Sequence, residues 1–180
     1  PSVYGQRILD ALLERLKESN ESHYPIHLKF NTGLNRLGFD PKGRDGVSLS
    51  EAWAEGPATL HGVLSNGFPN MFMISTVQGA QATNFVHSIT EAAQHVAFLI
   101  EQCVKGDIAT IEPETAAQEN WFETLFAQLW GIARYNATCT PGYLNSEGGG
   151  DMRSARAIAW MTSVLGFAEY VENWRQQGDL

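Results

Sequence analysis

The sequence predicts an α+β fold, with short strands in the first half and a mainly helical second half. Glycine and proline residues punctuate the stretch from residue 31 to 70, which is typical of turns between short strands. From residue 84 onward, apolar residues instead recur at steps of three and four, which is the period of a helix. The chain has 180 residues, of which 43% are hydrophobic, enough to bury the core of one ordinary domain.

The first thirty residues predict one helix and one strand. In Gly5–Ser19 the apolar side chains fall on one stripe and the charged ones elsewhere, which indicates an amphipathic helix. The members of this stripe are Ile8, Leu9, Leu12, Leu13 and Leu16. In Pro25–Phe30, apolar side chains alternate with polar ones, as in a half-buried strand.

A brief apolar strand and a long helix follow. Met71–Ser75 is too short for a helix and lies between a proline and a glycine, so it predicts a strand. The helix after it starts at Thr83 or Asn84, either of which can cap it, and ends at Gly106. Its apolar stripe consists of Val86, Ile89, Ala93, Val96, Ile100 and Cys103.

Two further helices are predicted towards the end of the chain. Pro113 suits the first turn of a helix that runs to about Tyr135. We expect its aromatic side chains to fill the core: these are Trp121, Phe122, Phe126 and Trp130. A polar, glycine-rich loop follows. After it, apolar positions from Ala157 to Trp174 again have helical spacing, and they predict a helix at least from Gly166 onward.

Charge and hydropathy exclude several classes of function. Lys and Arg total 12 against 20 Asp and Glu, which gives a net charge of −8. That balance opposes binding to nucleic acid or to an anionic membrane surface. The longest apolar runs are far shorter than the roughly 20 residues that a membrane span needs, and no leader-like segment opens the chain. We therefore expect a cytoplasmic protein with no nucleic-acid and no membrane partner.

Motifs that carry chemistry are mostly missing. The chain has no G-x-G-x-x-G fingerprint, because its glycine cluster, Gly148–Gly150, follows a helix and a polar loop rather than a strand. It has no P-loop and no G-x-S-x-G elbow either, and no catalytic residue stands out. The five histidines are scattered and predict no metal site. Cys103 and Cys139 are expected to be reduced thiols with a structural role.

An ordered series of short motifs runs through residues 43–148. It contains G-R-D-G-V-S-L-S-E-A-W at 43–53, G-P-A-T-L-H-G at 56–62, G-F-P-N-M-F-M-I at 67–74, N-F-V-H at 84–87, Q-H-V at 94–96, I-E-P at 111–113, Trp121 and C-T-P-G-Y-L-N-S-E-G at 139–148. In this order and spacing, the series resembles the C-terminal part of the Baeyer–Villiger flavoprotein monooxygenases, over residues 30–180. Residues 1–29 do not share the resemblance. We therefore divide the chain into a divergent N-terminal helix and strand, 1–29, and a monooxygenase part, 30–180.

The resemblance implies an oxidoreductase. Members of the family use FAD and NADPH to insert one oxygen atom of O2 next to a ketone carbonyl, which gives an ester or a lactone. Their two G-x-G-x-x-G fingerprints lie upstream of the matched region, in two Rossmann-like α/β domains. This chain has neither fingerprint, so the resemblance implies a C-terminal portion of such a flavoprotein, with a ketone as the substrate. We expect it to need the N-terminal part of the enzyme as its partner and to be inactive alone.

Site residues follow from the resemblance, position by position. Met71–Ser75 corresponds to a strand of the FAD domain, and the helix after it points its N-terminal end at the flavin ring. The residues expected to bind the flavin are Thr76, Val77, Asn84 and Phe85. The substrate-pocket loop corresponds to Gly79, Ala80, Gln81, Ala82 and Thr83. The family usually has Gly-Pro in place of Thr76 and Val77, which bears on how closely the backbone approaches the ring.

Cys139–Gly148 matches the segment that folds over the nicotinamide cofactor in the family. Tyr143 and Asn145 are the residues there that we expect to bind NADPH. Many relatives have a tryptophan in place of Thr140. The alternative is that Tyr143 only packs and that Asn145 caps a turn.

Three further points stay open. The family has a strand at Ala157–Val164, against the helical spacing found there. The chain could instead be a non-catalytic relic, or a domain that binds a small apolar ligand on its aromatic surface. That surface would consist of Trp121, Phe122, Phe126 and Trp130. Exposed sheet edges would favour self-association into a homo-oligomer.

Overall fold

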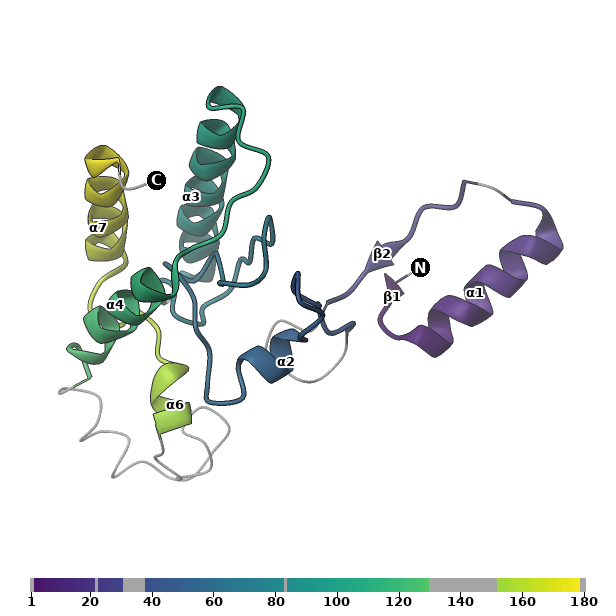
Figure 1. Ribbon diagram of the computed structural model, residues 1–180, viewed down its shortest axis with the longest axis horizontal. Helices are drawn as coiled ribbons and strands as arrows, with labels where there is room; N and C mark the ends of the chain where they lie inside the picture. The colour runs from purple at the N-terminus through teal and green to yellow at the C-terminus, as the bar shows by residue number, and fades with distance from the viewer. Residues whose placement is uncertain (1, 22, 31–37, 83, 130–151, 179–180) are drawn as a thin grey trace. The chain divides into compact units, whose positions relative to one another are not determined.

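The computed structural model describes residues 2–21, 23–30, 38–82, 84–129 and 152–178 (Figure 1). The chain forms two compact units, Pro1–Ala52 and Trp53–Leu180. In the described residues helices predominate, and the strands are few and short. This agrees with the predicted α+β class, in which the second half of the chain is mainly helical. The division of the chain after residue 29 stays a prediction.

The first unit begins with a strand, a helix and a second strand. Strand β1 (Ser2–Val3) pairs in parallel with β2 (His27–Leu28), and α1 (Gln6–Ser19) connects them. The predicted first helix is therefore confirmed. It ends where Asn20 takes the left-handed conformation, with φ of 55°. None of the α1 side chains is buried.

The strand predicted at Pro25–Phe30 is shorter and more exposed than expected. His27 and Leu28 form it, and both are exposed, as is Phe30. The expected half-burial is therefore wrong. A ladder of two residues in each strand covers little side-chain surface, so the alternation of apolar and polar residues has no layer to pack into.

A short helix, α2 (Leu49–Ala52), lies where the sequence predicted only turns and short strands. A capping box forms it. The N–H of Ser48 donates to Oε2 of Glu51 at 2.9 Å, and the N–H of Glu51 donates to Oγ of Ser48 at 3.3 Å. The bonds from the N–H and the hydroxyl of Ser48 hold the pKa of the Glu51 carboxyl below its usual value. An isolated bridge between Leu60 and Leu64 is one remnant of the predicted strands.

The segment Met71–Ser75, predicted as a strand, is not one. Its backbone makes one bond to a distant segment among the described residues, from the N–H of Met73 to the C=O of Val63 at 2.9 Å. A strand needs a neighbour that pairs with it over several residues. The predicted strand is therefore wrong, because the segment makes only one such backbone hydrogen bond within the described residues.

Helix α3 (Phe85–Lys105) confirms the longest predicted helix, with Asn84 as the N-cap and Gly106 as the C-cap. The stripe that predicted it is divided: Ala93, Val96 and Cys103 are half-buried, whereas its other members are exposed. The inner face consists of the buried residues Ser88, Ala92, His95 and Leu99. The outer stripe consists of the exposed residues Val86, Ile89, Ile100 and Val104. The helix therefore buries a face of mixed polarity and leaves an aliphatic stripe exposed.

Helix α4 (Thr115–Phe126) confirms part of the helix predicted from Pro113. Glu114 is its N-cap, so Pro113 lies just before the helix rather than in its first turn. The helix is followed by a turn at 127–129. The predicted continuation beyond residue 129 lies outside the described residues.

Two further helices end the second unit, α6 (Met152–Arg156) and α7 (Val164–Gln177). Ser163 caps α7, because its Oγ accepts a backbone N–H of the first turn at 3.3 Å. Between the two helices, Trp160 forms a parallel bridge with Ala80. The helical spacing therefore misleads in the segment before α7, where the strand alternative describes the backbone better.

Among the described residues, two apolar clusters belong to the core of the second unit. The first contains Ala80, Trp121, Leu125, Phe167 and Val171. The second contains Val63, Leu64, Ala92 and Leu99. Helix α3 supplies residues to the second cluster and α7 to the first, and the two helices pack against each other (Figure 1). The predicted core role is confirmed for Trp121 and Phe122, which are buried, but it is wrong for Phe126, which is 42% exposed.

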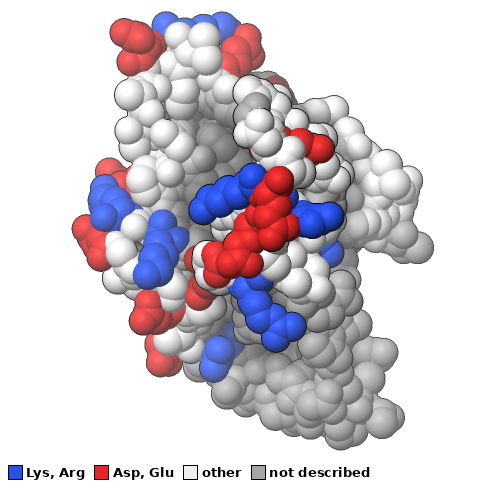
Figure 2. All heavy atoms as spheres, turned by 90° about the vertical axis from the view of Figure 1, so that its right-hand side faces the viewer, with Lys and Arg blue, Asp and Glu red and all other residues white. Residues whose placement is uncertain are grey.

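The surface carries charges of both signs. Figure 2 shows acidic and basic side chains interspersed over one face of the molecule. Exposed pairs such as Arg15 and Glu18, 3.0 Å apart, contribute little to stability because water screens them. Within the described residues, no helix has the length and apolar character that a membrane span requires.

Candidate functional site

The loop 76–82 leads into α3 and contains most of the residues expected near the substrate. It is anchored to the segment before α7. The N–H of Trp160 donates to the C=O of Gly79 at 2.9 Å, and the N–H of Gln81 donates to the C=O of Trp160 at 3.2 Å. Because the pairing is parallel, Ala80 and Trp160 lie opposite each other with their side chains on one side. The loop is therefore held in place by backbone bonds.

The five predicted substrate residues have different surroundings. Gly79 and Ala80 are buried, and Ala80 belongs to the first core cluster. Gln81 is exposed and Ala82 is half-buried. Thr83 lies outside the described residues. A molecule in solvent could reach the side chain of Gln81 directly, but not that of Ala80.

The N-terminal end of α3 is open to solvent. Asn84 is exposed, and its side chain accepts no hydrogen bond from the helix. Phe85 is 56% exposed and Val86 is 70% exposed. A helix leaves its first N–H groups without partners inside the helix and carries a partial positive charge there. This end can therefore receive an acceptor oxygen or a negative charge.

One turn further along α3, the hydroxyl of Ser88 is buried and has no hydrogen-bond partner among the described residues. Ser88 is 5% exposed, so water does not reach the hydroxyl freely. A buried polar group without a partner costs about 1–3 kcal/mol. The hydroxyl lies on the inner face of α3 with His95, so it is not part of the open end of the helix.

The remaining predicted cofactor residues divide into two groups. Thr76 and Val77 are half-buried at the start of the loop, and the N–H of Val77 donates to Oγ of Ser75 at 3.2 Å. Tyr143 and Asn145 lie outside the described residues, as does the whole predicted nicotinamide loop. The described members of the predicted flavin and substrate sets therefore lie in one stretch of chain, from Thr76 to Phe85, that leads into α3.

Gln78 is a residue of this loop that the sequence analysis missed. It is fully buried, and its φ of 54° lies in the left-handed region. Its side-chain oxygen accepts two hydrogen bonds from Thr59, and its amide nitrogen donates to the C=O groups of Pro57 and Arg156. The indole N–H of Trp121 donates to its C=O at 2.9 Å. Glutamine is usually exposed, so the sequence carries no signal for this burial.

Two histidines that lie 34 positions apart in the sequence meet in the core. Nδ1 of His61 lies 3.1 Å from Nε2 of His95, and Nε of Arg175 donates to Nδ1 of His95 at 3.4 Å. Because a guanidinium only donates, Nδ1 of His95 is an acceptor, and its Nε2–H is donated to His61. Burial, helped by the charge of Arg175, lowers the pKa of both imidazoles to about 3. The view of the histidines as scattered is therefore wrong for this pair.

The turn that carries His61 also supports the substrate loop. A Cβ on Gly62 would lie 2.8 Å from both the N and the Cα of Gly79, so a side chain does not fit there. Gly62 also has a φ of 74°, which glycine adopts without strain. The backbones of the turn and of the loop are therefore in direct contact.

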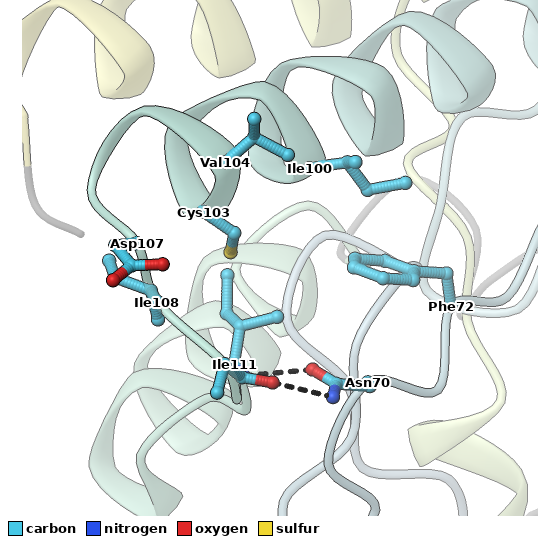
Figure 3. A pocket seen from close by; sticks show the side chains of 9 residues that line it. Asn70, Phe72, Ile100, Cys103, Val104, Asp107, Ile108 and Ile111 are labelled. Carbon is cyan, nitrogen blue, oxygen red and sulfur yellow. Dashed lines mark hydrogen bonds between the residues drawn. The ribbon is translucent and has the colours of Figure 1, made fainter.

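An open apolar cleft of about 450 Å³ lies at the other end of α3 (Figure 3). The residues that line it include Phe72, Ile100, Cys103, Val104 and Ile108. Asn70 closes one side, because its amide bonds the N–H of Ile111 and the C=O of Ala109, both at 3.0 Å. The Cys103 thiol is free and points towards the cleft. The cleft lies far along α3 from Asn84, so it is distinct from the site at the start of the helix.

Curated relatives match most of this chain. The Baeyer-Villiger monooxygenase of Streptomyces coelicolor is 37% identical over 179 residues, which cover 92% of this chain and 29% of that protein. The FAD-binding monooxygenase hmp7 of Hypomyces subiculosus is 31% identical over 166 residues, which cover 88% of this chain and 28% of that protein. The resemblance to Baeyer–Villiger-type flavin-containing monooxygenases is confirmed. No family model matches the chain.

Solved monooxygenase structures share the fold. The polycyclic ketone monooxygenase from Thermothelomyces thermophila has a TM-score of 0.71 at 31% identity, and the match covers 79% of this chain and 23% of that one. The FAD-bound form of OTEMO has a TM-score of 0.62 at 25% identity, and the match covers 88% of this chain and 30% of that one. This chain therefore spans about a quarter to a third of the length of the monooxygenases that it matches.

Proposed function

We propose that this chain is the C-terminal portion of an FAD- and NADPH-dependent monooxygenase. The complete enzyme would insert one oxygen atom of O2 next to a ketone carbonyl, which gives an ester or a lactone. The N-terminal part would supply the two Rossmann-like dinucleotide-binding domains, and the chain would be inactive without it. The observation that carries the proposal is the open end of α3, where Asn84 and Phe85 are exposed.

The start of α3 has the donors that a flavin would need. The first N–H groups and the positive end of the helix dipole would stabilise negative charge on the pyrimidine carbonyls of the ring. Phe85 would cover the ring edge and keep water away from it. FAD, when bound, supplies redox chemistry with O2 that no side chain of this chain offers.

The other ligands are assigned to neighbouring segments. The ketone would lie against Gly79–Thr83, where the exposed Gln81 offers a polar contact. Tyr143 and Asn145 would hold NADPH from the loop that contains them. Thr76 and Val77 would lie at the flavin with Asn84. Location in the cytoplasm and assembly into a homo-oligomer stay predictions.

The test is ketone conversion by the complete enzyme, in which this chain is joined to or mixed with the N-terminal part. The purified protein should show flavin absorbance. It should consume NADPH and O2 in step with the appearance of an ester or lactone, detected by mass spectrometry, from a panel of cyclic and aryl ketones. The 180-residue chain alone should convert none of them. Absence of bound flavin under every pairing with the N-terminal part would contradict the proposal.

A second candidate function is the binding of a small apolar molecule. The cleft at the C-terminal end of α3 favours it, because Phe72, Ile100 and Val104 form apolar walls (Figure 3). The aromatic surface expected from the sequence is a poorer place, since Trp121 and Phe122 are buried. Binding of an apolar fluorescent dye to the chain alone, abolished by Ile100→Asp, would favour this function if FAD binding were absent.

A further inference from the structure

We propose that Gln78 is a positioning residue, which fixes the described part of the substrate loop, Gly79–Ala82, ahead of α3. The inference rests on the proposed function, in which this loop borders the ketone. Gln78 is fully buried, so it does not touch a substrate itself. It acts through the backbone of the loop that it begins.

The side-chain amide of Gln78 is used completely. Its Oε1 accepts from the N–H of Thr59 at 2.8 Å and from the hydroxyl of Thr59 at 2.7 Å. Its Nε2 donates to the C=O of Pro57 at 2.8 Å and to the C=O of Arg156 at 2.9 Å. Because an amide has two donor hydrogens and two acceptor lone pairs, no capacity remains. These bonds allow one orientation of the amide, and they join two segments that are far apart in the sequence.

The main chain of Gln78 is bonded as well. Its N–H donates to the C=O of Ile158 at 2.9 Å, and its C=O accepts from the indole of Trp121 at 2.9 Å. These bonds hold the backbone at a φ of 54°, which glutamine rarely adopts. The next residues then pair with Trp160. Gln78 therefore sets both the position and the direction of the loop at its start.

Arg156, one partner of Gln78, is bonded to α4. Arg156 forms a two-pronged ion pair with Glu119, at 3.1 and 2.6 Å. Its guanidinium also lies over the ring of Phe122, 4.4 Å from the centroid. These contacts attach Arg156 to α4, and the carbonyl that receives the Gln78 amide belongs to this anchored residue.

Thr59, a second partner of Gln78, connects it to the turn that contains Gly62. Oγ1 of Thr59 accepts from the N–H of Gly62 at 3.1 Å, in addition to its bond with Gln78. The backbone of Gly62 touches that of Gly79. The loop is thus supported from two directions by groups that Gln78 bonds, which is the support that a precisely placed binding loop requires.

Two variants of Gln78 test separately its amide donors and the length of its side chain. Gln78→Glu keeps the length but places a carboxylate against two carbonyl oxygens. Gln78→Asn keeps the amide and tolerates a left-handed backbone, but it is one methylene too short to reach all of its partners. Gln94→Glu adds the same charge at an exposed position of α3 and serves as the matched control.

Hydrogen–deuterium exchange on the 180-residue chain tests the positioning. Both Gln78 variants should speed exchange at the N–H groups of Gln81 and Trp160 by at least about tenfold, because buried hydrogen bonds that hold the loop are lost. Gln94→Glu should leave these rates unchanged, and the N–H of Phe167 in α7 should exchange at the wild-type rate in all variants. Unchanged exchange at Gln81 and Trp160, or equal acceleration at Phe167, would overturn the inference.

Steady-state kinetics of the complete monooxygenase gives the second readout. In both Gln78 variants the KM for the ketone should rise about tenfold while kcat stays within about threefold, and Gln94→Glu should behave as wild type. A KM that does not change would overturn the inference even if exchange accelerates. A wild-type enzyme that oxidises no ketone would overturn the proposed function and the substrate role with it, whereas the exchange data would still show whether Gln78 holds the loop.

Discussion

Two faces of α3 differ in burial in a way that their polarity does not explain. The inner face is buried although Ser88 and His95 are polar. The outer stripe is aliphatic and yet exposed, with Val104 at 77%. An apolar stripe shows that a helix has a side to bury, but not which surface will cover it. We expect the N-terminal part of the monooxygenase to cover the outer stripe, while the core of this chain takes the other side.

Acidification should give the largest effect, through His95 on the inner face. In the folded chain the pKa of both His61 and His95 is about 3, against the ordinary value of 6.5. Between these values the unfolded chain binds more protons. The free energy of unfolding is therefore highest above pH 6.5 and falls as the pH drops towards 3. The slope should approach about 1.4 kcal/mol per pH unit for each histidine, measured by urea unfolding across that range.

A matched pair of variants on the same helix checks the source of this slope. His95→Gln keeps a hydrogen-bonding side chain that does not titrate, so the slope should fall by about half. Gln94→Ala changes an exposed side chain of α3 that does not titrate and should keep the wild-type slope. A slope that His95→Gln leaves unchanged would show that the buried pair does not control acid stability.

Truncation of an aliphatic side chain should give the next largest effect, and only on the inner face. Leu99 is 1% exposed, so Leu99→Ala should lower the free energy of unfolding by about 2–5 kcal/mol. Val104→Ala removes a similar group from the outer stripe and should change it by less than about 0.5 kcal/mol. Urea unfolding of the two variants measures both values. Equal losses would mean that the assignment of the two faces is wrong.

Removal of the Ser88 hydroxyl should have a smaller effect of opposite sign. Ser88→Ala should raise the free energy of unfolding of the 180-residue chain by about 1 kcal/mol, because it deletes a buried group that has no partner among the described residues. Ala92→Ser adds such a group one turn away on the same face and should lower it by about 1–3 kcal/mol. Thermal unfolding monitored by circular dichroism compares the two. A loss of stability in Ser88→Ala would mean that the hydroxyl has a partner.

A charge on the outer stripe should have the smallest effect on folding. Val104→Lys should change the free energy of unfolding by less than about 0.5 kcal/mol, because the side chain is already in water. It should also reduce any self-association of the chain, which sedimentation velocity measures. A large destabilisation would show that the outer stripe is packed within this chain.

The helices could be predicted because their signals are local. The spacing of apolar residues located α1 and α3, and Asn84 and Gly106 marked the ends of α3. The sequence also contains a local signal for α2, because Ser48 and Glu51 have the spacing of a capping box. The strand at Met71–Ser75 was predicted wrongly because a strand depends on a neighbour elsewhere in the chain.

The candidate site was predictable only in its outline. The start of α3 and the loop before it follow from the motif series, but the residues that hold the loop do not. Gln78 binds Arg156, which lies 78 positions away, and His61 meets His95 at a distance of 34 positions. Neither pairing leaves a pattern in the sequence, because each depends on tertiary packing. The first brings the end of α6 to the loop 76–82, and the second brings α3 to the turn at 57–62.

Binding of FAD to the complete enzyme, stripped of its flavin, tests the central assignment at the start of α3. Phe85→Asp places a carboxylate at the end of the helix, where the dipole favours it and the fold is kept, but where it opposes negative charge on the flavin. The matched control is Gln94→Asp, which adds the same charge at an exposed position further along the helix. We expect the Kd for FAD to rise by at least about tenfold in Phe85→Asp and to stay at the wild-type value in Gln94→Asp. A Phe85→Asp enzyme that binds FAD as tightly as wild type would contradict the assignment.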